Sequence, residues 1–553
     1  MSEFKRSRSL KLFALLLAMS LIAAACGGDD GDAETTTAEG EPVVGGTLVV
    51  GAEQEPSESL NVELAAGNLA WAQWIINSTT LRGAFVQLPD FTYGPDMITE
   101  EPVPEEDPFA ITYTIKEEAQ WSDETPISAE DFEFTWQVYI DEKNKVASRA
   151  GYDVIEDAEI IDEKTIKFTF SEPYAGWRDL FRTVFPKHAL EGENFNRVWT
   201  NEIVNPQTGE PIASGPFIFE SYEKGSELTV VRNENYWGEH TAYLDSIVFR
   251  FIPETASEIQ ALRGGEVDAI YPQPQLELAE LTAEPNIEIE TNPGTTWEHM
   301  DFQYANELLA QDFVRQAIAF GVNRQAIVDQ LFQSITPDLP LLQNMIFLNP
   351  SPFYEEHFNI YEHDPEQAIS LLEENGCTRD GPQDIFECDG QELSFGFKST
   401  AGNALRELVF EIVQEQLRLV GIDVKSEFGD AAVVFGDQGL VGGKYDIFMF
   451  AWVGSPDPGG SVEIHKCEGS QNYQAYCNEE VTDLLEESDV TVDPQARADL
   501  MNQADELMAQ DLPILPLYVK PTFFAFHSKL QNAIDNPTQA GFAWNAVEWF
   551  IEE

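Results

Sequence analysis

Positively charged residues are scarce in this chain. Lysine and arginine together number 31, against 98 aspartates and glutamates, so the formal net charge is −67 over 553 residues. Nucleic-acid-binding proteins need clustered lysine and arginine to displace counterions, and anionic membrane surfaces attract the same residues. We therefore expect no nucleic-acid partner and no binding to lipid headgroups. The acidic residues are spread along the whole chain, which favours a saline environment that screens self-repulsion over a site for cationic ligands.

Motifs for common catalytic chemistry are absent. The chain has no Gly-x-Ser-x-Gly elbow, no His-Glu-x-x-His pair, no P-loop and no Gly-x-Gly-x-x-Gly loop. The histidines are scattered, and only His357 and His363 come near a metal-ligand spacing, in a polar stretch. Close acidic pairs occur by chance among 98 carboxylates, so none can be singled out. We predict that the protein is not an enzyme and has neither cofactor nor metal.

Long apolar runs are also missing. The longest, residues 12–25, is shorter than the ~20 residues that a membrane-spanning helix needs. It follows a basic segment (5–11) and ends in small residues before Cys26, which resembles the processing site of bacterial lipoproteins. An ordinary secretory peptide with an incidental cysteine is the alternative. We predict a signal peptide over 1–25, a lipid on Cys26 and a flexible acidic linker over 26–42. The protein would then be lipid-anchored at the outer face of the cell membrane, with no spanning segment.

The five cysteines leave four besides Cys26, in two close pairs. Cys377 precedes Cys388, and Cys467 precedes Cys477, each pair bracketing a polar, turn-rich stretch. Export permits oxidation. We predict two local disulfides, each contributing about 2–3 kcal/mol by restricting the unfolded chain. Zinc is the alternative, but both spacings lack the short Cys-x₂₋₄-Cys knuckle.

Strand and helix patterns alternate through the body of the chain. Alternating apolar residues predict strands at 111–115, 166–170 and 247–251. After the third strand, the box from Thr255 to Glu258 predicts a helix start, and the chain returns as a strand at 267–271. A strand–helix–strand unit this short predicts parallel strands.

A second such unit follows later in the sequence. A strand at 393–397 leads through a helix at 404–420 to a strand that begins at Ile422. Asp364 with Pro365 predicts another helix start. The segment 446–452 is almost continuously apolar, as in a strand buried on both faces. The fold class is therefore α/β, with several sheets, and the length predicts two to four domains.

Several short motifs occur along the chain in a fixed order. The most specific is Trp121–Pro126 followed by Ser128–Phe132, and others lie at 47–61, 214–217, 233–237, 262–268, 314–327, 364–376, 419–423 and 513–517. In order and content these motifs resemble the extracellular solute-binding proteins of family 5, the peptide- and nickel-type receptors of ABC importers, in which glycine is usual at the position of Glu124. Most of these residues are typical of turns and cores, so they identify the fold and not the solute contacts.

The resemblance implies a two-lobed, periplasmic-binding-protein-like fold of the large peptide-binding type, closing on a solute by a hinge. It implies a first lobe at 43–83, 213–293 and 519–553, an inserted subdomain at 84–212, a second lobe at 297–515, and hinges near 293–294 and 516–521. It also implies a monomeric receptor that captures peptides or a related organic solute and delivers it to the permease. A sensor or adhesion module without transport and a secreted hydrolase on an unrelated scaffold are the alternatives.

Loops facing the expected cleft supply the candidate ligand contacts. Helix N-termini receive anionic groups, and open α/β sheets place ligands at the carboxyl ends of their strands. The expected ligand-binding residues are Glu55, Trp297, His299, Thr400, Asn403, Trp452, Ser455 and Asp457. The tryptophans and His299 are alternatively plain core residues.

In the peptide receptors an aspartate three residues after the tryptophan that matches Trp452 pairs with the ligand's α-amino group. That position is Ser455 in this chain, and the nearest carboxylate, Asp457, lies two residues further on. Unless Asp457 takes over this role, the ammonium clamp is missing. The resemblance then favours oligopeptides, oligosaccharides or other organic solutes over dipeptides.

Overall fold

The structure is a computed structural model and describes residues 42–56 and 59–552. The chain separates into two units, residues 1–42 and 43–553, and the fold below is that of the second. The predicted signal peptide, Cys26 and nearly all of the linker lie outside the described residues. Within the described ranges, every helix is too short or too polar to cross a bilayer.

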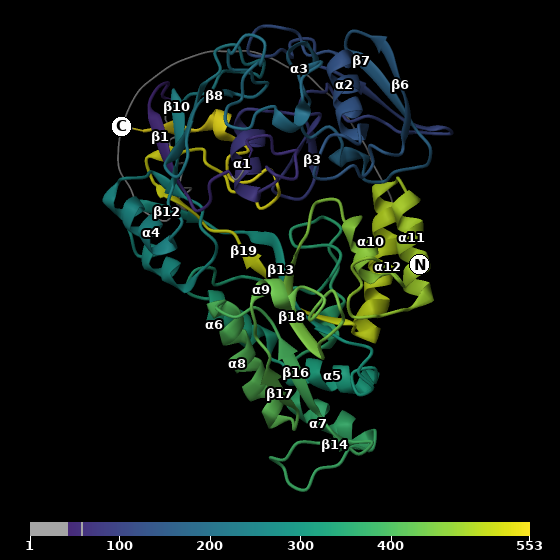
Figure 1. The fold of residues 1–553 in the computed structure, drawn as a ribbon. Helices are drawn as coiled ribbons and strands as arrows, with labels where there is room; N and C mark the ends of the chain where they lie inside the picture. The colour runs from purple at the N-terminus through teal and green to yellow at the C-terminus, as the bar shows by residue number, and fades with distance from the viewer. Residues whose placement is uncertain (1–41, 57–58, 553) are drawn as a thin grey trace, which may run out of the picture. The chain divides into compact units, whose positions relative to one another are not determined.

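A seven-stranded mixed sheet forms the centre of what we call the first lobe (Figure 1). Its order is β12 (Ile287–Glu290), β20 (Phe524–His527), β11 (Ala269–Ile270), β1 (Thr47–Ala52), β10 (Ser246–Phe251), β9 (Glu227–Arg232) and β8 (Phe217–Glu223). Helix α4 (Thr255–Gly264) connects β10 to β11, and both strands pair parallel with β1. The predicted parallel unit is confirmed, with β1 lying between its two strands.

The capping box expected at Thr255 is wrong. Thr255 is the first residue of α4, and the residue before it, Glu254, makes no side-chain cap. The side chain of Glu258 is instead fully buried, and neither carboxylate oxygen has a hydrogen-bond partner. It lies against β1, where a Cβ on Gly51 would stand 3.7 Å from its Oε1. The Thr-x-x-Glu pattern therefore predicted the helix correctly but placed Thr255 at its N-cap, whereas Thr255 is the first helical residue. Glu258 packs into the interior and does not cap the helix.

A four-stranded antiparallel sheet lies in the sequence between α1 (Ala70–Thr79) and β8. Its order is β4 (Glu105–Glu106), β5 (Phe109–Thr114), β7 (Thr165–Phe170) and β6 (Ile155–Asp162). The strands predicted near 111–115 and 166–170 are β5 and β7. Helix α2 (Ala129–Ile140) begins with a capping box between Ser128 and Asp131. This stretch also contains the hairpin β2 (Phe85–Gln87) and β3 (Tyr93–Pro95), helix α3 (Lys187–Leu190) and two short 3-10 helices, Trp177–Asp179 and Phe195–Arg197.

A five-stranded sheet forms the centre of what we call the second lobe. Its order is β17 (Asp423–Ser426), β16 (Ser394–Lys398), β18 (Ile447–Val453), β13 (Pro293–Phe302) and β19 (Ile514–Pro521). Helix α8 (Ala404–Leu419) connects β16 to β17, which pair in parallel as predicted. The first four residues of β18 are buried, but Trp452 is half-buried and Val453 is 67% exposed. The expected burial on both faces therefore fails at the carboxyl end of β18.

Helices surround this second sheet, and Figure 1 shows α10, α11 and α12 grouped together. Helix α7 begins at Pro365 with Asp364 as its N-cap, as predicted. Besides α8, the second-lobe α-helices are α5 (Asp312–Gly321), α6 (Arg324–Phe332), α7 (Pro365–Glu374), α9 (Ala431–Val434), α10 (Gly460–His465), α11 (Glu479–Val490) and α12 (Pro494–Asp511). Two small two-stranded sheets complete the strands: the hairpin of β14 (Glu387–Cys388) and β15 (Gln391–Glu392), and, near the end of the chain, β21 (Leu530–Gln531) with β22 (Phe550–Ile551).

Both predicted disulfides are present in the structure. Cys377 is bonded to Cys388, and Cys467 to Cys477. The first disulfide joins the segment after α7 to β14. The second joins the two ends of the loop that connects α10 to α11. Loops of this length give about 3 kcal/mol each when restriction of the unfolded chain is the only contribution.

Two neighbouring chain segments connect the two sheets. One runs from β12 into β13, and the other from β19 into β20. The amide of Thr522 donates to the carbonyl of Asn292 at 2.8 Å. A Cβ on Gly294 would stand 2.5 Å from the carbonyl oxygen of Lys520, so only glycine allows this approach of the two backbones. The hinges were predicted at these positions, and their motion stays a prediction.

Candidate functional site

One cavity is lined by polar residues of both lobes, and we call it the polar cavity. Its lining on the first-lobe side follows β11, and on the second-lobe side it comes from the start of α8 and from β19. The empty volume is about 970 Å³. The lining residues that carry polar side chains are Gln273, Gln275, Glu277, Asn403 and Lys520. Neither lobe alone encloses this space.

A buried ion cluster lies beside the polar cavity. Glu298 on β13 is 1% exposed, and its Oε1 lies 2.9 Å from both Lys520 Nζ and Arg406 Nη2. Burial raises the pKa of Glu298, but the charges of Lys520 and Arg406 outweigh it and hold the pKa below its ordinary value. One carboxylate meets two cations, which leaves one positive charge near the N-terminus of α8. Such an arrangement favours an anionic group.

The structure brings Thr400 and Asn403 together around Arg406. The Oδ1 of Asn403 caps α8 by accepting from the amide of Arg406 at 3.1 Å. The hydroxyl of Thr400 accepts from Arg406 Nη1 at 2.9 Å. Asn403 lines the polar cavity, whereas Thr400 acts through Arg406, which is itself held by Glu298. These contacts fix the position of the positive charge.

A second cavity, which we call the tryptophan cavity, belongs to the second lobe and has an empty volume of about 840 Å³. It brings together four expected residues: Trp297, Trp452, Ser455 and Asp457. Trp452 stacks on Tyr473, with ring centroids 6.2 Å apart and planes at 12°. Its indole Nε1 is buried and has no hydrogen-bond partner. Aliphatic side chains of Met345, Ile346, Leu348 and Ile464 complete the wall.

The carboxylate of Asp457 already has a partner. Arg497 Nη1 lies 2.6 Å from Asp457 Oδ2, Nη2 lies 3.2 Å from Oδ1, and the amide of Gly459 donates to Oδ1 at 2.8 Å. The hydroxyl of Ser455 donates to the Asp457 carbonyl. A paired carboxylate attracts a ligand ammonium group weakly, because Arg497 has neutralised it. The loop shift that would let Asp457 replace the absent clamp is therefore not what the structure shows.

His299 and Glu55 line none of the cavities named in this section. His299 is fully buried, with Nε2 at 3.2 Å from Asp301 Oδ1 and its ring centroid 4.3 Å from that of Phe450. Glu55 is exposed and accepts from the Tyr222 hydroxyl at 3.2 Å and the Gly225 amide at 2.8 Å, which fixes the turn between β8 and β9. Their roles in binding stay predictions.

A third cavity was not expected from the sequence, and we call it the apolar cavity. One side carries the β2–β3 hairpin and residues near 175–178, and the other carries the loop at 347–353 and the start of α12. Its empty volume is about 880 Å³. A signal existed: the stretch Ile346–Tyr354 is rich in aromatics and proline yet has neither helical nor strand periodicity.

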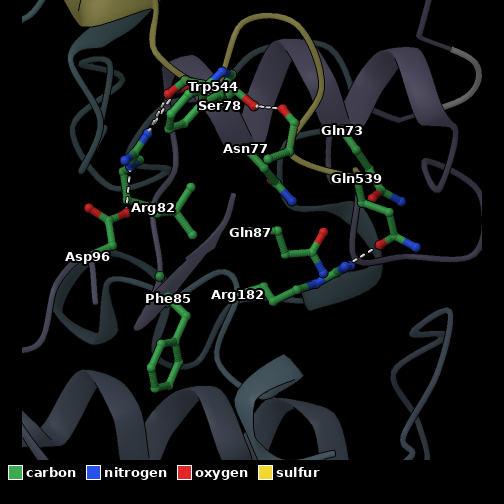
Figure 2. Close-up of a pocket in the computed structure, with 13 residues that line it drawn as sticks. Gln73, Asn77, Ser78, Arg82, Phe85, Gln87, Asp96, Arg182, Gln539 and Trp544 are labelled. Carbon is green, nitrogen blue, oxygen red and sulfur yellow. Dashed lines mark hydrogen bonds and ion pairs between the residues drawn. The ribbon is translucent and has the colours of Figure 1, made fainter. Parts of the chain in front are cut away.

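A fourth cavity lies within the first lobe alone, between α1 and the chain's last turns (Figure 2). Arg82 is paired with Asp96 at 2.6 Å, and Arg182 donates to Gln539. Both guanidinium groups thus have acceptors, and the buried polar side-chain atoms of the lining that lack a partner are single amide oxygens of Asn77 and Gln87. Among the described residues, His, Cys, Asp and Glu form no group of three or more suited to a metal ion.

Comparison with known sequences identifies the family. The model of the bacterial extracellular solute-binding proteins, family 5 (middle region), matches residues 92–472. An oligopeptide-binding protein OppA of Mycobacterium tuberculosis is 28% identical over 469 residues, covering 82% of this chain and 76% of its own. The oligopeptide-binding protein AppA of Bacillus subtilis is 23% identical over 564 residues, covering 99% of each chain.

Solved structures show the same fold. The periplasmic EDTA-binding protein EppA has a TM-score of 0.80 at 24% identity, covering 95% of this chain and 100% of its own. AppA of Bacillus subtilis in complex with a nonapeptide has a TM-score of 0.70 at 22% identity, covering 93% and 100%. NikZ of Campylobacter jejuni in complex with Ni(L-His) has a TM-score of 0.71 at 21% identity, covering 91% and 99%. This chain therefore belongs to the bacterial extracellular solute-binding proteins of family 5 and has their two-lobed α/β fold.

Proposed function

We propose that this protein is the lipid-anchored, monomeric solute receptor of an ABC importer, binding a peptide or related organic solute between its lobes and delivering it unchanged to the permease. The observation that carries this proposal is the polar cavity, because each lobe supplies only part of its lining. Relatives in the comparison are oligopeptide- and dipeptide-binding proteins. The titles of the structural neighbours name EDTA and Ni(L-His), which keeps chelates among the solutes to test.

The proposed division of the chain follows its sheets. Strands of the seven-stranded sheet fall within 43–83, 213–293 and 519–553, which we assign to the first lobe, and the four-stranded sheet falls within the inserted subdomain, 84–212. We assign 297–515 to the second lobe; the end of β19, with Lys520, still belongs to the five-stranded sheet and lies in the hinge segment near 516–521, where the chain passes into the first lobe. Rotation about the paired segments near 293–294 and 516–521 would open and close the polar cavity.

The charges suggest what kind of solute fits. Lys520, Arg406 and the start of α8 supply positive charge on one side of the polar cavity, of which Glu298 neutralises one unit, and Glu277 places a carboxylate on the first-lobe side. The tryptophan cavity offers aromatic faces, aliphatic side chains and a carboxylate that Arg497 has already neutralised. We propose a solute that carries an anionic end toward Lys520 and a neutral or apolar end toward Trp452. Dipeptides, which depend most on their α-amino group, fit this pattern less well than longer peptides.

A solute panel tests the proposal directly. The exported protein, freed of co-purified ligand, would be screened by thermal shift against peptides of increasing length, oligosaccharides, nickel and its histidine chelate. A true ligand at about 100-fold its Kd should stabilise the folded state by about 2.7 kcal/mol. Mass spectrometry should recover that ligand unaltered. If no member of the panel shifts the Tm, solute import is contradicted.

Lys520→Met sharpens this test. Loss of its charge should weaken binding of a carboxylate-ended solute by roughly tenfold, since a buried charged hydrogen bond contributes about 1.5–3 kcal/mol. Lys425→Met is the matched control, because Lys425 lies on the same sheet with a 70% exposed side chain.

The lipid anchor has its own test. Cys26→Ser should move the full-length protein from the membrane fraction to the medium or periplasm, because the thiol that carries the lipid is gone. A single lipid-modified cysteine is the only attachment proposed, so the change should be nearly complete. The double variant Cys377→Ser/Cys388→Ser is the control, since it removes two cysteines but retains Cys26 and should stay membrane-bound. Retention of Cys26→Ser in the membrane fraction would rule out the lipid.

A further inference from the structure

We propose that the apolar cavity is a second subsite, which takes a bulky apolar group, aromatic or branched aliphatic, of the bound solute. The inference rests on the proposed function, because the group belongs to the same solute that occupies the interlobe site. It adds a part of the chain that none of the expected contacts included: the β2–β3 hairpin and the 347–353 loop.

The lining of the apolar cavity offers contact area and few donors. Aromatic rings come from both sides of the cavity, Phe91 and Tyr93 on one and Phe347 and Phe353 on the other. The hydroxyl of Tyr93 is already donating to Asp179 at 3.0 Å. The prolines of the wall, which lack an N–H, are Pro352, Pro456, Pro458 and Pro494. Most of this lining offers no hydrogen-bonding group, and the polar atoms that do line it are held mainly in the ion pairs Arg178–Glu101 and Arg497–Asp457, apart from the buried Nε of Arg497, which has no partner.

The two cations of the cavity are neutralised inside its own lining. Arg178 Nη2 lies 2.5 Å from Glu101 Oε1, and Arg497 Nη1 lies 2.6 Å from Asp457 Oδ2. All four residues line the cavity. No net charge therefore remains to compensate an ionic group, whereas an apolar group gains about 25 cal/mol for each Å² removed from water.

The apolar cavity adjoins the tryptophan cavity. Asp457 and Pro458 line both. One loop forms the wall between them: Met345, Ile346 and Leu348 line the tryptophan cavity, whereas Phe347, Pro352 and Phe353 line the apolar cavity. The proposal places the solute's main body against Trp452 and its apolar side group beyond Pro458, in the second space.

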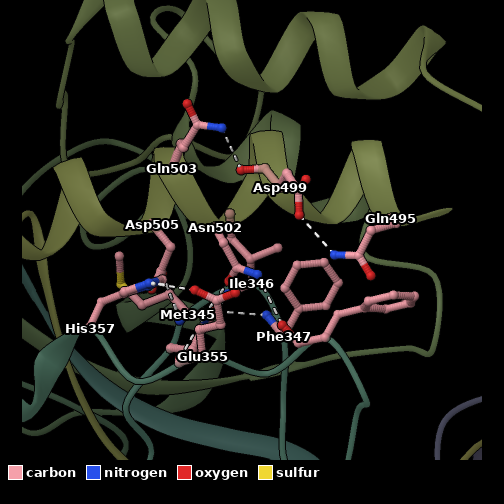
Figure 3. Close-up of polar contacts among 12 residues, drawn as sticks. Met345, Ile346, Phe347, Glu355, His357, Gln495, Asp499, Asn502, Gln503 and Asp505 are labelled. Carbon is pink, nitrogen blue, oxygen red and sulfur yellow. Dashed lines mark hydrogen bonds and ion pairs between the residues drawn. The ribbon is translucent and has the colours of Figure 1, made fainter. Parts of the chain in front are cut away.

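Buried polar side chains hold this wall in place (Figure 3). Asp505 of α12 is fully buried, accepts from the amide of Met345 at 2.9 Å and binds His357 Nδ1 at 2.7 Å. Asn502, one turn earlier, donates to the carbonyl of Phe353 at 3.0 Å. The amide of Phe347 is held by Asn344 Oδ1 at 2.8 Å. A wall fixed from a helix is preorganised, so little ordering entropy is lost when a group binds.

On the hairpin side of the cavity, Phe91 packs against residues of the second lobe. This residue is 5% exposed and packs in the same buried cluster as Phe347 and Leu348. Its φ of 64° is unusual for a bulky residue and places the ring at the hairpin turn. The amide of Ala175 donates to the carbonyl of Asp489 at 3.3 Å across the same contact. The cavity is complete only with both sides in place, so closure would bury the group that it holds.

Fluorescence titration of the exported protein with N-phenyl-1-naphthylamine, an uncharged aromatic probe, tests the subsite without knowledge of the solute. We expect saturable binding at one site. Val492→Asp places an unpaired charge in the lining and should weaken probe binding at least tenfold. Val490→Asp is the matched control, because Val490 is 48% exposed outside the lining.

A second variant pair guards against misfolding of the first. Ala498→Trp on α12 should fill the cavity and abolish probe binding, whereas Ala496→Trp, on the exposed face of the same helix, should not. Circular dichroism and Tm would confirm folding of each variant. Absence of saturable probe binding, or equal binding by all four variants, overturns the subsite.

The solute panel separates this inference from the proposed function. For a peptide that binds, exchange of one phenylalanine for serine should weaken binding to the wild type and have little effect in Val492→Asp. Solute binding that persists with no such difference at any position would overturn the subsite and leave the receptor function standing. A flat panel together with probe binding that responds to Val492→Asp would contradict import and also the subsite's role in it.

Discussion

Glu258→Gln is expected to stabilise the protein at neutral and alkaline pH and to flatten the pH dependence of its stability. Burial, with a smaller contribution from the charge of Glu53, raises the pKa of Glu258 to about 8. The folded state therefore holds a proton that the unfolded state, with a pKa near 4.5, releases. Stability contributed by a raised pKa falls as pH rises, at up to about 1.4 kcal/mol per pH unit between the two values.

The expected magnitude at pH 7 is about 2–4 kcal/mol, because neither carboxylate oxygen of Glu258 has a partner to offset its desolvation. Glutamine has the shape of the protonated side chain and no proton to lose. Calorimetric Tm values between pH 5 and pH 8.5 would show a steep decline for the wild type and a shallower one for the variant. Glu254→Gln, at the exposed N-cap of the same helix, is the control and should follow the wild type. Parallel curves for all three proteins would contradict the assignment.

Glu258 also shows what local sequence patterns can predict and what they cannot. The pattern fixed the existence of α4 and its parallel strands, because apolar spacing and the glycines after Arg263 depend only on local chemistry. It placed the glutamate at the helix start, where a capping box would expose it. Glu258 is buried because it lies on the side of α4 that faces β1. It contacts the region of Gly51, which is about 200 positions earlier in the sequence. Tertiary packing decided the outcome, and no local signal reports it.

The candidate site likewise contains residues that local sequence patterns predict and residues whose position depends on tertiary packing. Trp452 and Ser455 could be placed beside a cavity because the carboxyl end of a buried strand is a local prediction, and Asn403 because it precedes a helix. His299 follows Trp297 by two residues on the same strand, yet its side chain is fully buried with Asp301. The stretch Ile346–Tyr354 gave a local sign of the apolar cavity, but the cavity itself could not be predicted, since it joins a hairpin near residue 90 to a loop near residue 350. Sites assembled from distant segments need the fold first.

Lys520 shows a signal that sequence reading can use. It interrupts the apolar strand Ile514–Pro521, in a chain where basic residues are few. A lysine in such a strand is costly unless it is paired. The partner, Glu298, is another charge in a strand of largely buried residues. Lys520 therefore predicts a buried acidic partner, although the sequence alone shows neither that β13 and β19 pair nor whether Glu298 or Asp301 of β13 is that partner.

Glu298→Gln is expected to lower stability by about 3–5 kcal/mol at neutral pH, because it leaves Arg406 and Lys520 without their shared carboxylate. Its pH dependence has the opposite sign to that of Glu258. The pKa of Glu298 lies below its ordinary value, so its contribution is present above the unfolded pKa of about 4.5 and is lost as pH falls through the folded pKa. The wild type should therefore lose stability on acidification below about pH 4.5, and the variant should lose less.

The control for Glu298→Gln is Glu427→Gln. Glu427 lies 3.6 Å from Lys398, with its side chain 52% exposed, and an exposed pair of this kind contributes at most about 1 kcal/mol. Both variants remove one negative charge from the second lobe, so any difference between them reports burial and pairing and not net charge. Because Lys520 lines the polar cavity, Glu298→Gln should also change the affinity for a carboxylate-ended solute, whereas Glu427→Gln should not. Equal stability losses in the two variants would show that the buried cluster contributes no more than a surface ion pair.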